Sequence, residues 1–414
     1  MSGQGWPSLL RGALRPNRRE HPRSVWPPDG DMTRRLLLVS TATRWLGTAR
    51  MPRVLARAGF EVSLLAPKDS LATKSRYLTH IGILPVTATP SEWLRGLVQM
   101  VEKVSPQMLV PCDEMAIRLL FTVALTPPPG LASMRWARLV RLIAASLGDP
   151  QRYAVSIDKT LLPSAAQALG VRVPPYALAA RIEDAIEHAA VLHYPVVLKR
   201  RFGFAGQGVA VVSTPTELAD AAQQLMRPDP LDLGEPGRTQ LLVQAYIDGP
   251  HHSQALVALR GVPVAGFAWE RHVATSPVKG QTTVLRFVNS RETRDFSEAL
   301  CRGFGMSGFF NVQFVIDQRS GAAHLLEINR RLVTHMHMGE RVGEDLGRAL
   351  FDALEGNARH AMQGSDEGSG ESVVVFPREW LRDPESRLLT ELPVDLPWDE
   401  PELLVAMLAM RHEE

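Results

Sequence analysis

The chain has 414 residues, of which 45% are hydrophobic and 22% charged, enough for two or three domains with a sizeable core. Forty-six Lys and Arg residues face 44 Asp and Glu residues, for a net charge of +2, so a basic surface for nucleic acid is not indicated. The most apolar stretch, residues 108–125, is broken by Asp113, Glu114 and Arg118. It is therefore not expected to cross a membrane.

The first part of the chain predicts a leader rather than a folded element. Residues 1–32 are rich in Arg and Pro and lack the apolar core of a secretory signal, which favours a disordered leader over a targeting arm. The chain holds two cysteines, Cys112 and Cys301. So few thiols argue against a disulfide scaffold, and we interpret both as buried structural thiols of a cytoplasmic protein.

Residues 33–150 alternate between apolar runs and amphipathic segments. The runs at 36–39, 61–65 and 108–111 predict strands, and the segments at 48–58 and 90–104 predict helices. Such alternation is typical of a parallel sheet with helical crossovers. The turn at 40–47 lacks the Gly-x-Gly-x-x-Gly fingerprint, so we do not expect a dinucleotide site there.

Two acidic residues follow the strand predicted at 108–111. Asp113 and Glu114 would lie at the carboxyl edge of the parallel sheet, where ligands commonly bind. Carboxylates are also common at helix N-termini that bind no ligand. Both interpretations stay open at this point.

A glycine-rich hairpin is predicted further along the chain. Residues 194–199 form an apolar strand that ends in Lys199, and residues 209–212 return as a second strand. Between them stand the glycines at positions 203, 206 and 208. Glycine amides can approach an anion closely, and a lysine supplies a charge for phosphate. Alone the pattern is weak, because many hairpins contain glycine only for their turn.

Two further segments belong with this hairpin. Asp158 and Lys159 stand at the head of a predicted helix. Residues 241–247 predict a strand that runs into a turn, where the backbone at Gln244, Ala245, Tyr246 and Ile247 could pair with the edge of an adenine.

The strands predicted at 311–317 and 323–329 carry the most informative pattern. Residues two apart in a strand face the same side, so Glu327 and Asn329 share a face that Gln313 can oppose. Three oxygen ligands on one face suit Mg²⁺, which completes its shell with water and phosphate. Arg331 continues the same parity and would point towards a transferred phosphoryl group.

Five segments carry these patterns: Asp158–Lys159, the glycine-rich hairpin, residues 241–247, and the strands at 311–317 and 323–329. Taken in chain order, they resemble the ATP-grasp superfamily, and most closely its carbamoyl-phosphate-synthetase-like carboxylate–amine ligases. The resemblance spans about residues 33–350. It implies an α/β and α+β fold in which an N-terminal parallel-sheet pre-ATP-grasp domain (33–150) precedes a two-subdomain ATP-grasp fold (151–355). The lid subdomain would occupy about 185–245, and 356–414 would form a linker and C-terminal segment.

The resemblance also implies a role for each motif. ATP would lie between the subdomains, with Mg²⁺, or Mn²⁺ in its place, held by Gln313, Glu327 and Asn329. Lys159 and Lys199 would contact the phosphates. Nucleotide contacts would also come from Gly203, Gly206, Gly208, Gln244, Ala245, Tyr246, Ile247 and His251.

The implied catalytic residues are Arg331, Lys199 and Arg286. The sequence departs from the family pattern at Gln244, where an acidic residue is usual, and at His251, which replaces the glutamate of a Gly-Pro-Glu pattern. Arg330 replaces a proline of the metal motif.

The implied reaction is ADP-forming ligation of a small carboxylate, an amino acid included, to an amine through an acyl phosphate. Cations available to the substrate are Arg271, His272, Lys279, Arg286 and Arg294. Arg286 lies within an apolar strand-like run, and an ordinary surface position is an equal alternative. His335 and His337 either line the acceptor pocket or are structural.

Two other functions compete with this one. A bicarbonate-using carboxylase or carbamoyl-phosphate-type enzyme would keep the fold, but no biotin-attachment segment and no second ATP-grasp copy is found in the sequence. A non-catalytic ATP-binding regulator would not need Arg331 and the metal set. Expected partners are the small-molecule carboxylate and amine substrates, without nucleic acid or membrane; a homodimer and the role of the C-terminal segment stay open.

Overall fold

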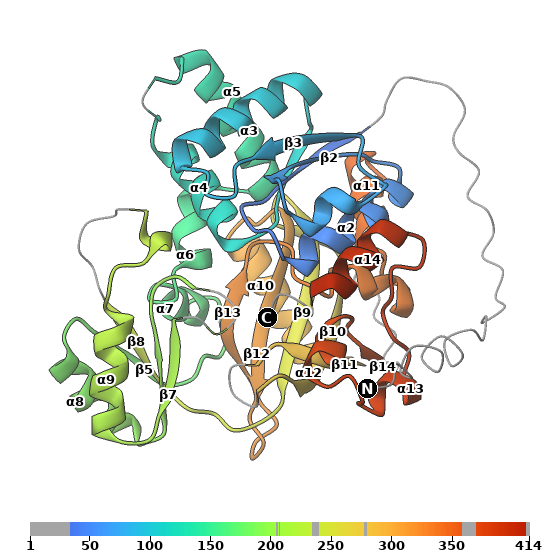
Figure 1. The fold of residues 1–414 in the computed structure, drawn as a ribbon. Helices are drawn as coiled ribbons and strands as arrows, with labels where there is room; N and C mark the ends of the chain where they lie inside the picture. Colours follow the sequence, from blue (N-terminus) through green and yellow to red (C-terminus); the bar gives the residue numbers. More distant parts are fainter. Residues whose placement is uncertain are drawn as a thin grey trace.

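A computed structural model describes residues 34–128, 130–203, 206, 208–233, 240–276, 280–357 and 370–410. The predicted leader therefore lies outside the described residues. The residues in these ranges form three sheets with helices packed around them (Figure 1). Within the described ranges, every helix is too short or too polar to cross a bilayer.

The N-terminal unit contains the predicted parallel sheet. Its strand order is β3-β2-β1-β4, formed by β1 (Arg35–Val39), β2 (Glu61–Pro67), β3 (His80–Leu84) and β4 (Met108–Pro111). The helices of this unit are α2 (Leu46–Ala58), η1 (Leu71–Lys74), α3 (Pro90–Val104), α4 (Glu114–Leu125) and α5 (Ser133–Leu147). The predicted alternation of strands and helices is confirmed.

Local sequence signals explain where two of these helices begin and end. The α2 helix ends at Gly59, whose φ of 111° is readily adopted only by glycine. The α3 helix begins with a capping box, in which the Thr89 side chain accepts from the Glu92 amide and Glu92 reaches back to the Thr89 amide.

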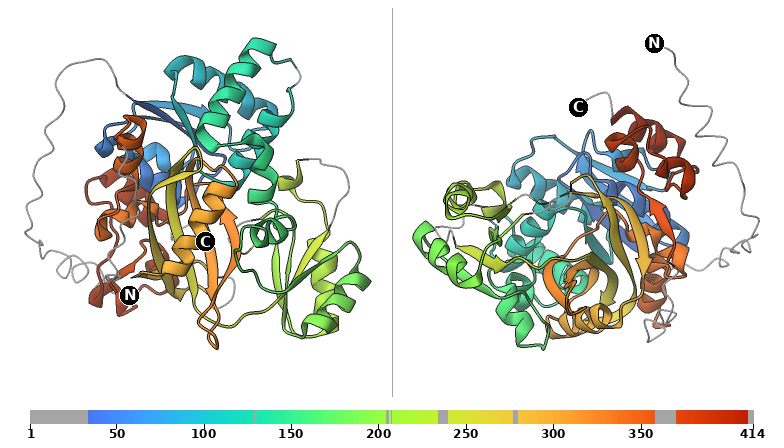
Figure 2. Two further views of the ribbon diagram at one scale, coloured as in Figure 1. Left: turned by 180° about the vertical axis from the view of Figure 1, so that it is seen from behind. Right: turned by 90° about the horizontal axis from the view of Figure 1, so that it is seen from below.

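A small antiparallel sheet follows after η2 (Pro150–Arg152), α6 (Tyr153–Ile157) and α7 (Leu162–Gln167). Its strand order is β5-β8-β6-β7, formed by β5 (Tyr176–Ala179), β6 (Val196–Lys199), β7 (Val209–Val212) and β8 (Leu241–Ala245). The remaining elements of this part are α8 (Ile182–Leu192), α9 (Pro215–Leu225) and η3 (Pro230–Asp232). Figure 2 shows this sheet and its two long helices at one side of the molecule, away from the C-terminal helices. The predicted hairpin is thus the β6–β7 pair.

The large antiparallel sheet forms the centre of the molecule, with strand order β13-β12-β9-β10-β11-β14. Its strands are β9 (His251–Leu259), β10 (Val262–Ala274), β11 (Thr282–Val288), β12 (Gly308–Ile316), β13 (Ala323–Asn329) and β14 (Ser372–Val374). Accompanying elements are α10 (Arg291–Gly303), η4 (Met336–Val342) and α11 (Leu346–Leu354). The edge strand β14 shows that the C-terminal segment is part of this sheet.

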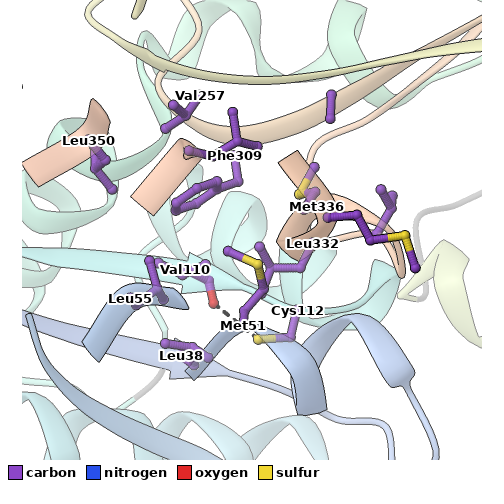
Figure 3. Close-up of a cluster of buried hydrophobic side chains, with 14 of the residues drawn as sticks. Leu38, Met51, Leu55, Val110, Cys112, Val257, Phe309, Leu332, Met336 and Leu350 are labelled. Carbon is purple, nitrogen blue, oxygen red and sulfur yellow. Dashed lines mark hydrogen bonds between the residues drawn. The ribbon is translucent and has the colours of Figure 1, made fainter. Parts of the chain in front are cut away.

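The N-terminal unit and the large sheet share one hydrophobic core (Figure 3). Leu38 and Val110 of the first sheet lie opposite Val257 and Phe309 of the large sheet, with Met51 of α2 among them. Because this core is continuous, the N-terminal unit cannot shift against the large sheet without exposing apolar surface.

The C-terminal segment packs on both of these units. Besides β14 it forms α12 (Arg378–Arg382), α13 (Leu388–Glu391) and α14 (Pro401–Ala409). Its Asp395 receives a hydrogen bond from Arg50 Nη2 of α2 at 2.7 Å and lies 2.7 Å from His337 Nε2. All three side chains are buried, so this cluster fixes the segment against the rest of the fold.

Asp395→Asn tests this connection. The substitution leaves the Arg50 guanidinium buried without its carboxylate, so we expect a loss of about 3–5 kcal/mol in the free energy of unfolding. Urea denaturation measures it, and Asp69→Asn, at an exposed position, is the control and should change it by less than about 0.5 kcal/mol. Equal unfolding midpoints for the two variants would contradict the assignment.

Candidate functional site

One cavity of about 440 Å³ lies where the small and large sheets face each other. Its walls come from β6, β7 and β8 on one side and from β9, β10, β12 and β13 on the other. It contains most of the residues that the sequence analysis selected: Lys199, Gly206, Gln244, Ala245, Tyr246, Ile247, His251, Gln313, Glu327, Asn329 and Arg331.

The predicted oxygen-rich face is present on β12 and β13. The register pairs Gln313 with Glu327 and Asn311 with Asn329, and all four side chains line the cavity. Asn311, which the sequence analysis did not select, is buried, and its Oδ1 accepts no hydrogen bond from any described residue. The strand pairing that placed Gln313 would also have placed Asn311.

Glu327 is the charged member of this face. Burial raises its pKa, but Lys159 and Lys199 more than compensate, so the pKa lies below its usual value and the carboxylate is ionised. Lys159 Nζ lies 3.4 Å from its Oε2, and Asn329 Nδ2 donates to its Oε1 at 3.2 Å.

These residues fit a hard divalent cation. An ionised carboxylate stands beside the amide oxygens of three residues, one of which is buried without a partner. Mg²⁺ prefers such oxygen donors and binds through few protein carboxylates. Within the described residues, no three His, Cys, Asp or Glu side chains gather into a cluster, so a zinc-type site is not indicated there.

Lys159 lies behind the cavity wall rather than in it. Its Nζ donates to the Gly203 carbonyl at 2.7 Å, and the neighbouring Asp158 accepts from Arg201 Nε at 2.8 Å. Both contacts hold the base of the β6–β7 hairpin. Lys159 thus connects the hairpin to Glu327.

The hairpin needs its glycines for backbone conformation. Gly203, Gly206 and Gly208 have φ values of 148°, 79° and 75°. A Cβ at Gly208 would lie 2.5 Å from the Arg200 side chain. Of the three, Gly206 lines the cavity, whereas Gly203 and Gly208 shape the turn.

Lys199 ends β6 and is almost entirely buried. Its Nζ donates to the Leu326 carbonyl at 3.3 Å. Burial lowers the pKa of Lys199 to about 8, with a smaller contribution from Lys159, while Glu327 acts in the opposite direction. It is therefore a cation at neutral pH that little solvent screens.

Arg331 is held by residues from two different units. Its Nη2 donates to Asn329 Oδ1 at 2.9 Å and its Nε to Glu114 Oε2 at 3.1 Å. The guanidinium also lies 4.7 Å from the ring centroid of Trp45. Glu114 and Trp45 belong to the N-terminal unit, so that unit contributes to the site directly.

The two acidic residues after β4 have different tasks. Asp113 caps α4 through the Ala116 amide and accepts hydrogen bonds from Ser40 and Thr41 in the loop before α2. Glu114 contacts Arg331. Asp113 is therefore a helix cap, and Glu114 holds an arginine of the cavity wall.

His251, at the start of β9, lines the cavity. Burial lowers its pKa to about 4, assisted by Arg271 and Lys199. The imidazole is thus neutral at pH 7 and can donate or accept one hydrogen bond.

Arg286 does not line the cavity. It lies exposed on β11 and donates through Nη2 to Glu270 Oε2 at 2.8 Å, which favours the surface alternative over a catalytic role. His272 is likewise exposed, and Arg294 bonds to Asn289. Arg271 lines the cavity, whereas Lys279 lies outside the described residues.

The two histidines after β13, His335 and His337, also differ. His337 is bonded to Asp395 and is structural, whereas His335 lines the cavity. Arg378, from the C-terminal segment, lines it as well. The sequence carried no motif that could connect Arg378 to this site.

Arg330, which replaces the family's proline, has a structural role. It is fully buried, and its guanidinium bonds to Ser156 Oγ at 3.0 Å and to the Leu147 carbonyl. Cys112 and Cys301 are both buried, as expected, and burial raises the pKa of each thiol. Neither is a reactive thiolate at neutral pH.

The electrostatics of Lys199 can be tested by titration. NMR of ¹³C-methylated lysines should show one resonance with a midpoint near pH 8, absent in Lys199→Arg, while lysines of the denatured protein titrate near pH 10.4. Glu327→Gln should move that midpoint lower, because Glu327 stabilises the ammonium form. A midpoint near 10.4 in the native protein would contradict the geometry.

Known proteins resemble this chain in both sequence and fold. The family model described as ATP-grasp domain matches residues 157–335. A carbamoyl phosphate synthase large chain from Hyperthermus butylicus is 24% identical over 209 residues, covering 48% of this chain and 18% of that protein. The chain thus spans less than a fifth of that relative's length.

Solved structures extend the similarity beyond the matched domain. Biotin carboxylase from Campylobacter jejuni superposes with a TM-score of 0.60 at 17% identity, covering 81% of this chain and 74% of that one. An L-amino acid ligase from Bacillus licheniformis gives 0.57 at 15% identity, covering 82% and 78%. At these identities the likeness concerns the fold. The family match assigns an ATP-grasp domain to residues 157–335, and the likeness of fold agrees with that assignment.

Proposed function

We propose that the protein is an ADP-forming ligase that activates a small carboxylic acid or amino acid as an acyl phosphate and joins it to an amine. The carrying observation is that one cavity unites the oxygen-rich face of Glu327 with two cations, Lys199 and Arg331. Joining a carboxylate to a nucleotide phosphate brings anions together, and this arrangement neutralises them.

The nucleotide would lie along the small-sheet side of the cavity. The backbone of residues 244–247 would meet the adenine, and Lys199 with the amide of Gly206 would meet the phosphates. Lys159 would act on the phosphates through its position beneath the hairpin. His251, neutral at pH 7, would offer the ribose a hydrogen bond in place of the family's acidic residue.

Gln313, Glu327 and Asn329 would hold Mg²⁺, with Asn311 beside them. The bound ion would supply neutralisation of the nucleotide phosphates and of the transferred phosphoryl group. Besides these neighbours, the Glu327 carboxylate has Lys159 Nζ at 3.4 Å and accepts from Asn329 Nδ2 at 3.2 Å.

The chemistry needs no covalent enzyme intermediate. A substrate carboxylate oxygen attacks the γ-phosphorus, and the bond to the bridging oxygen breaks with its electron pair to release ADP. Arg331, fixed by Glu114 and Asn329, then stabilises the acyl phosphate. The amine attacks the acyl carbon and inorganic phosphate leaves.

The two competing functions would each leave part of the cavity lining without a role. Bicarbonate is small, yet beyond Arg331 the cavity continues to Trp269, His335 and Arg378. A regulator without catalysis needs ATP contacts but has no need of an arginine, Arg331, fixed beside the oxygen-rich face. A ligase would use both the larger cavity and this arginine. We place it in the cytoplasm, consistent with two free buried cysteines.

Product analysis tests this function. With Mg²⁺-ATP, pooled carboxylic and amino acids, and hydroxylamine as surrogate amine, we expect ADP together with a hydroxamate. Glu327→Gln should lower kcat/KM by at least about 100-fold, because it removes the charged metal ligand. Glu183→Gln, at an exposed position on α8, is the matched control and should behave as wild type.

Two outcomes would contradict the proposal. Release of AMP and pyrophosphate would exclude an acyl phosphate. Nucleotide binding without turnover, equal in wild type and Glu327→Gln, would favour the regulator.

A further inference from the structure

Arg378 brings an uncompensated charge to the cavity wall. Its Nη2 donates to Thr334 Oγ1 at 2.9 Å and its Nη1 to the Thr282 carbonyl at 3.4 Å, while Nε has no partner among the described residues. No carboxylate of the described chain pairs with it, and burial lowers its pKa to about 10. It is still a cation at pH 7. A largely buried cation with only neutral partners indicates that the site receives an anion.

His335 stands next to this arginine. It is buried and lines the cavity, and neither ring nitrogen has a hydrogen-bond partner among the described residues. Burial and the Arg378 charge hold its pKa well below 6.5, so the ring is neutral and offers one donor and one acceptor. Its ring centroid lies 5.1 Å from that of Trp269.

Arg378 and His335 line the same cavity as Arg331. His335 stands four positions after Arg331, a span of at most about 14 Å, and Val333 and Thr334 between them also line the cavity. Trp45 and Trp269 add apolar surface to the same wall. A ligand bound by Arg378 and His335 could therefore extend towards the acyl phosphate that we place at Arg331.

We propose that Arg378 and His335 bind the nucleophilic substrate, and that this substrate is an amino acid. Arg378 binds its carboxylate, and His335 accepts a hydrogen bond from its amino group. The inference rests on the proposed ligase function and names the class of its amine. The amino acid's carboxylate would bind Arg378 and not the oxygen-rich face. It would therefore not be phosphorylated, while the other acid becomes the acyl phosphate.

The charges of the cavity favour the reactive form of such an amine. Arg378, Arg331 and Lys199 disfavour an additional ammonium ion, so the amino group binds after releasing one proton to solvent. Its lone pair forms the C–N bond to the acyl carbon. The C–O bond to phosphate breaks with its electron pair, and the leaving phosphate takes up the proton that nitrogen releases.

Two assays on the full-length protein separate this inference from the proposed function. Hydroxamate formation reports activation of the acid and does not use an amino acid as nucleophile. Amide formation with each of the twenty amino acids reports the nucleophile site. If wild type forms no hydroxamate with any acid, the ligase function itself fails.

Arg378→Met, Arg378→Lys and His335→Phe are the test variants. We expect each to raise KM for the amino acid nucleophile by about 10- to 100-fold, the effect of losing a charged or buried hydrogen bond, while hydroxamate formation stays within about twofold of wild type. Arg387→Met, at an exposed position of the same segment, is the control and should change neither assay. Melting temperatures and KM for ATP verify that each variant is folded, and Arg378→Lys keeps the charge should Arg378→Met not fold.

Three results would overturn the inference. The first is an unchanged KM for the amino acid in the folded Arg378 variants. The second is equal use of an amino acid and its decarboxylated amine by wild type. The third is a parallel loss of hydroxamate and amide formation with a raised KM for the activated acid, which would assign Arg378 to the acid instead.

Discussion

The ionised carboxylate of Glu327 is the interaction on which the rest of the site depends. Lys159 lies 3.4 Å from it and Lys199 is stabilised by its charge, so the carboxylate offsets the repulsion between the two lysines. Lys159 also holds the base of the glycine hairpin through the Gly203 carbonyl. One partly buried negative charge thus connects the small sheet, the large sheet and the glycine hairpin.

The ATP-grasp domain does not complete this site alone. The N-terminal unit supplies Glu114 and Trp45 to Arg331, and the C-terminal segment supplies Arg378. Both are held in position by packing: the first through the continuous core of Figure 3, the second through Asp395 and the edge strand β14. The fold outside the domain therefore shapes the end of the cavity where we place the second substrate.

Strand periodicity predicted the parts of the site that depend on local geometry. The parity of Glu327 and Asn329 and the opposition of Gln313 follow from two neighbouring strands joined by a short turn, and the register confirms them. The same reasoning could not place Arg286, because an apolar strand has two faces and its neighbours do not say which one meets the cavity.

Local sequence patterns could not predict contacts between segments that are far apart in the chain. Arg331 and Glu114 are 217 positions apart, and no motif marks that pair. Arg378 lies in residues 356–414, which the sequence identified only as a linker and C-terminal segment, and it lines the cavity because β14 joins this segment to the large sheet. Such residues become visible only when the packing of whole units is known.

The most direct test of the central claim follows oxygen atoms through the reaction. The acid identified by screening would be labelled with ¹⁸O in both carboxylate oxygens and turned over with Mg²⁺-ATP and its amine. An acyl phosphate predicts one ¹⁸O atom in each inorganic phosphate released, because the attacking oxygen leaves with phosphorus. Unlabelled phosphate, or label in AMP, would contradict the mechanism.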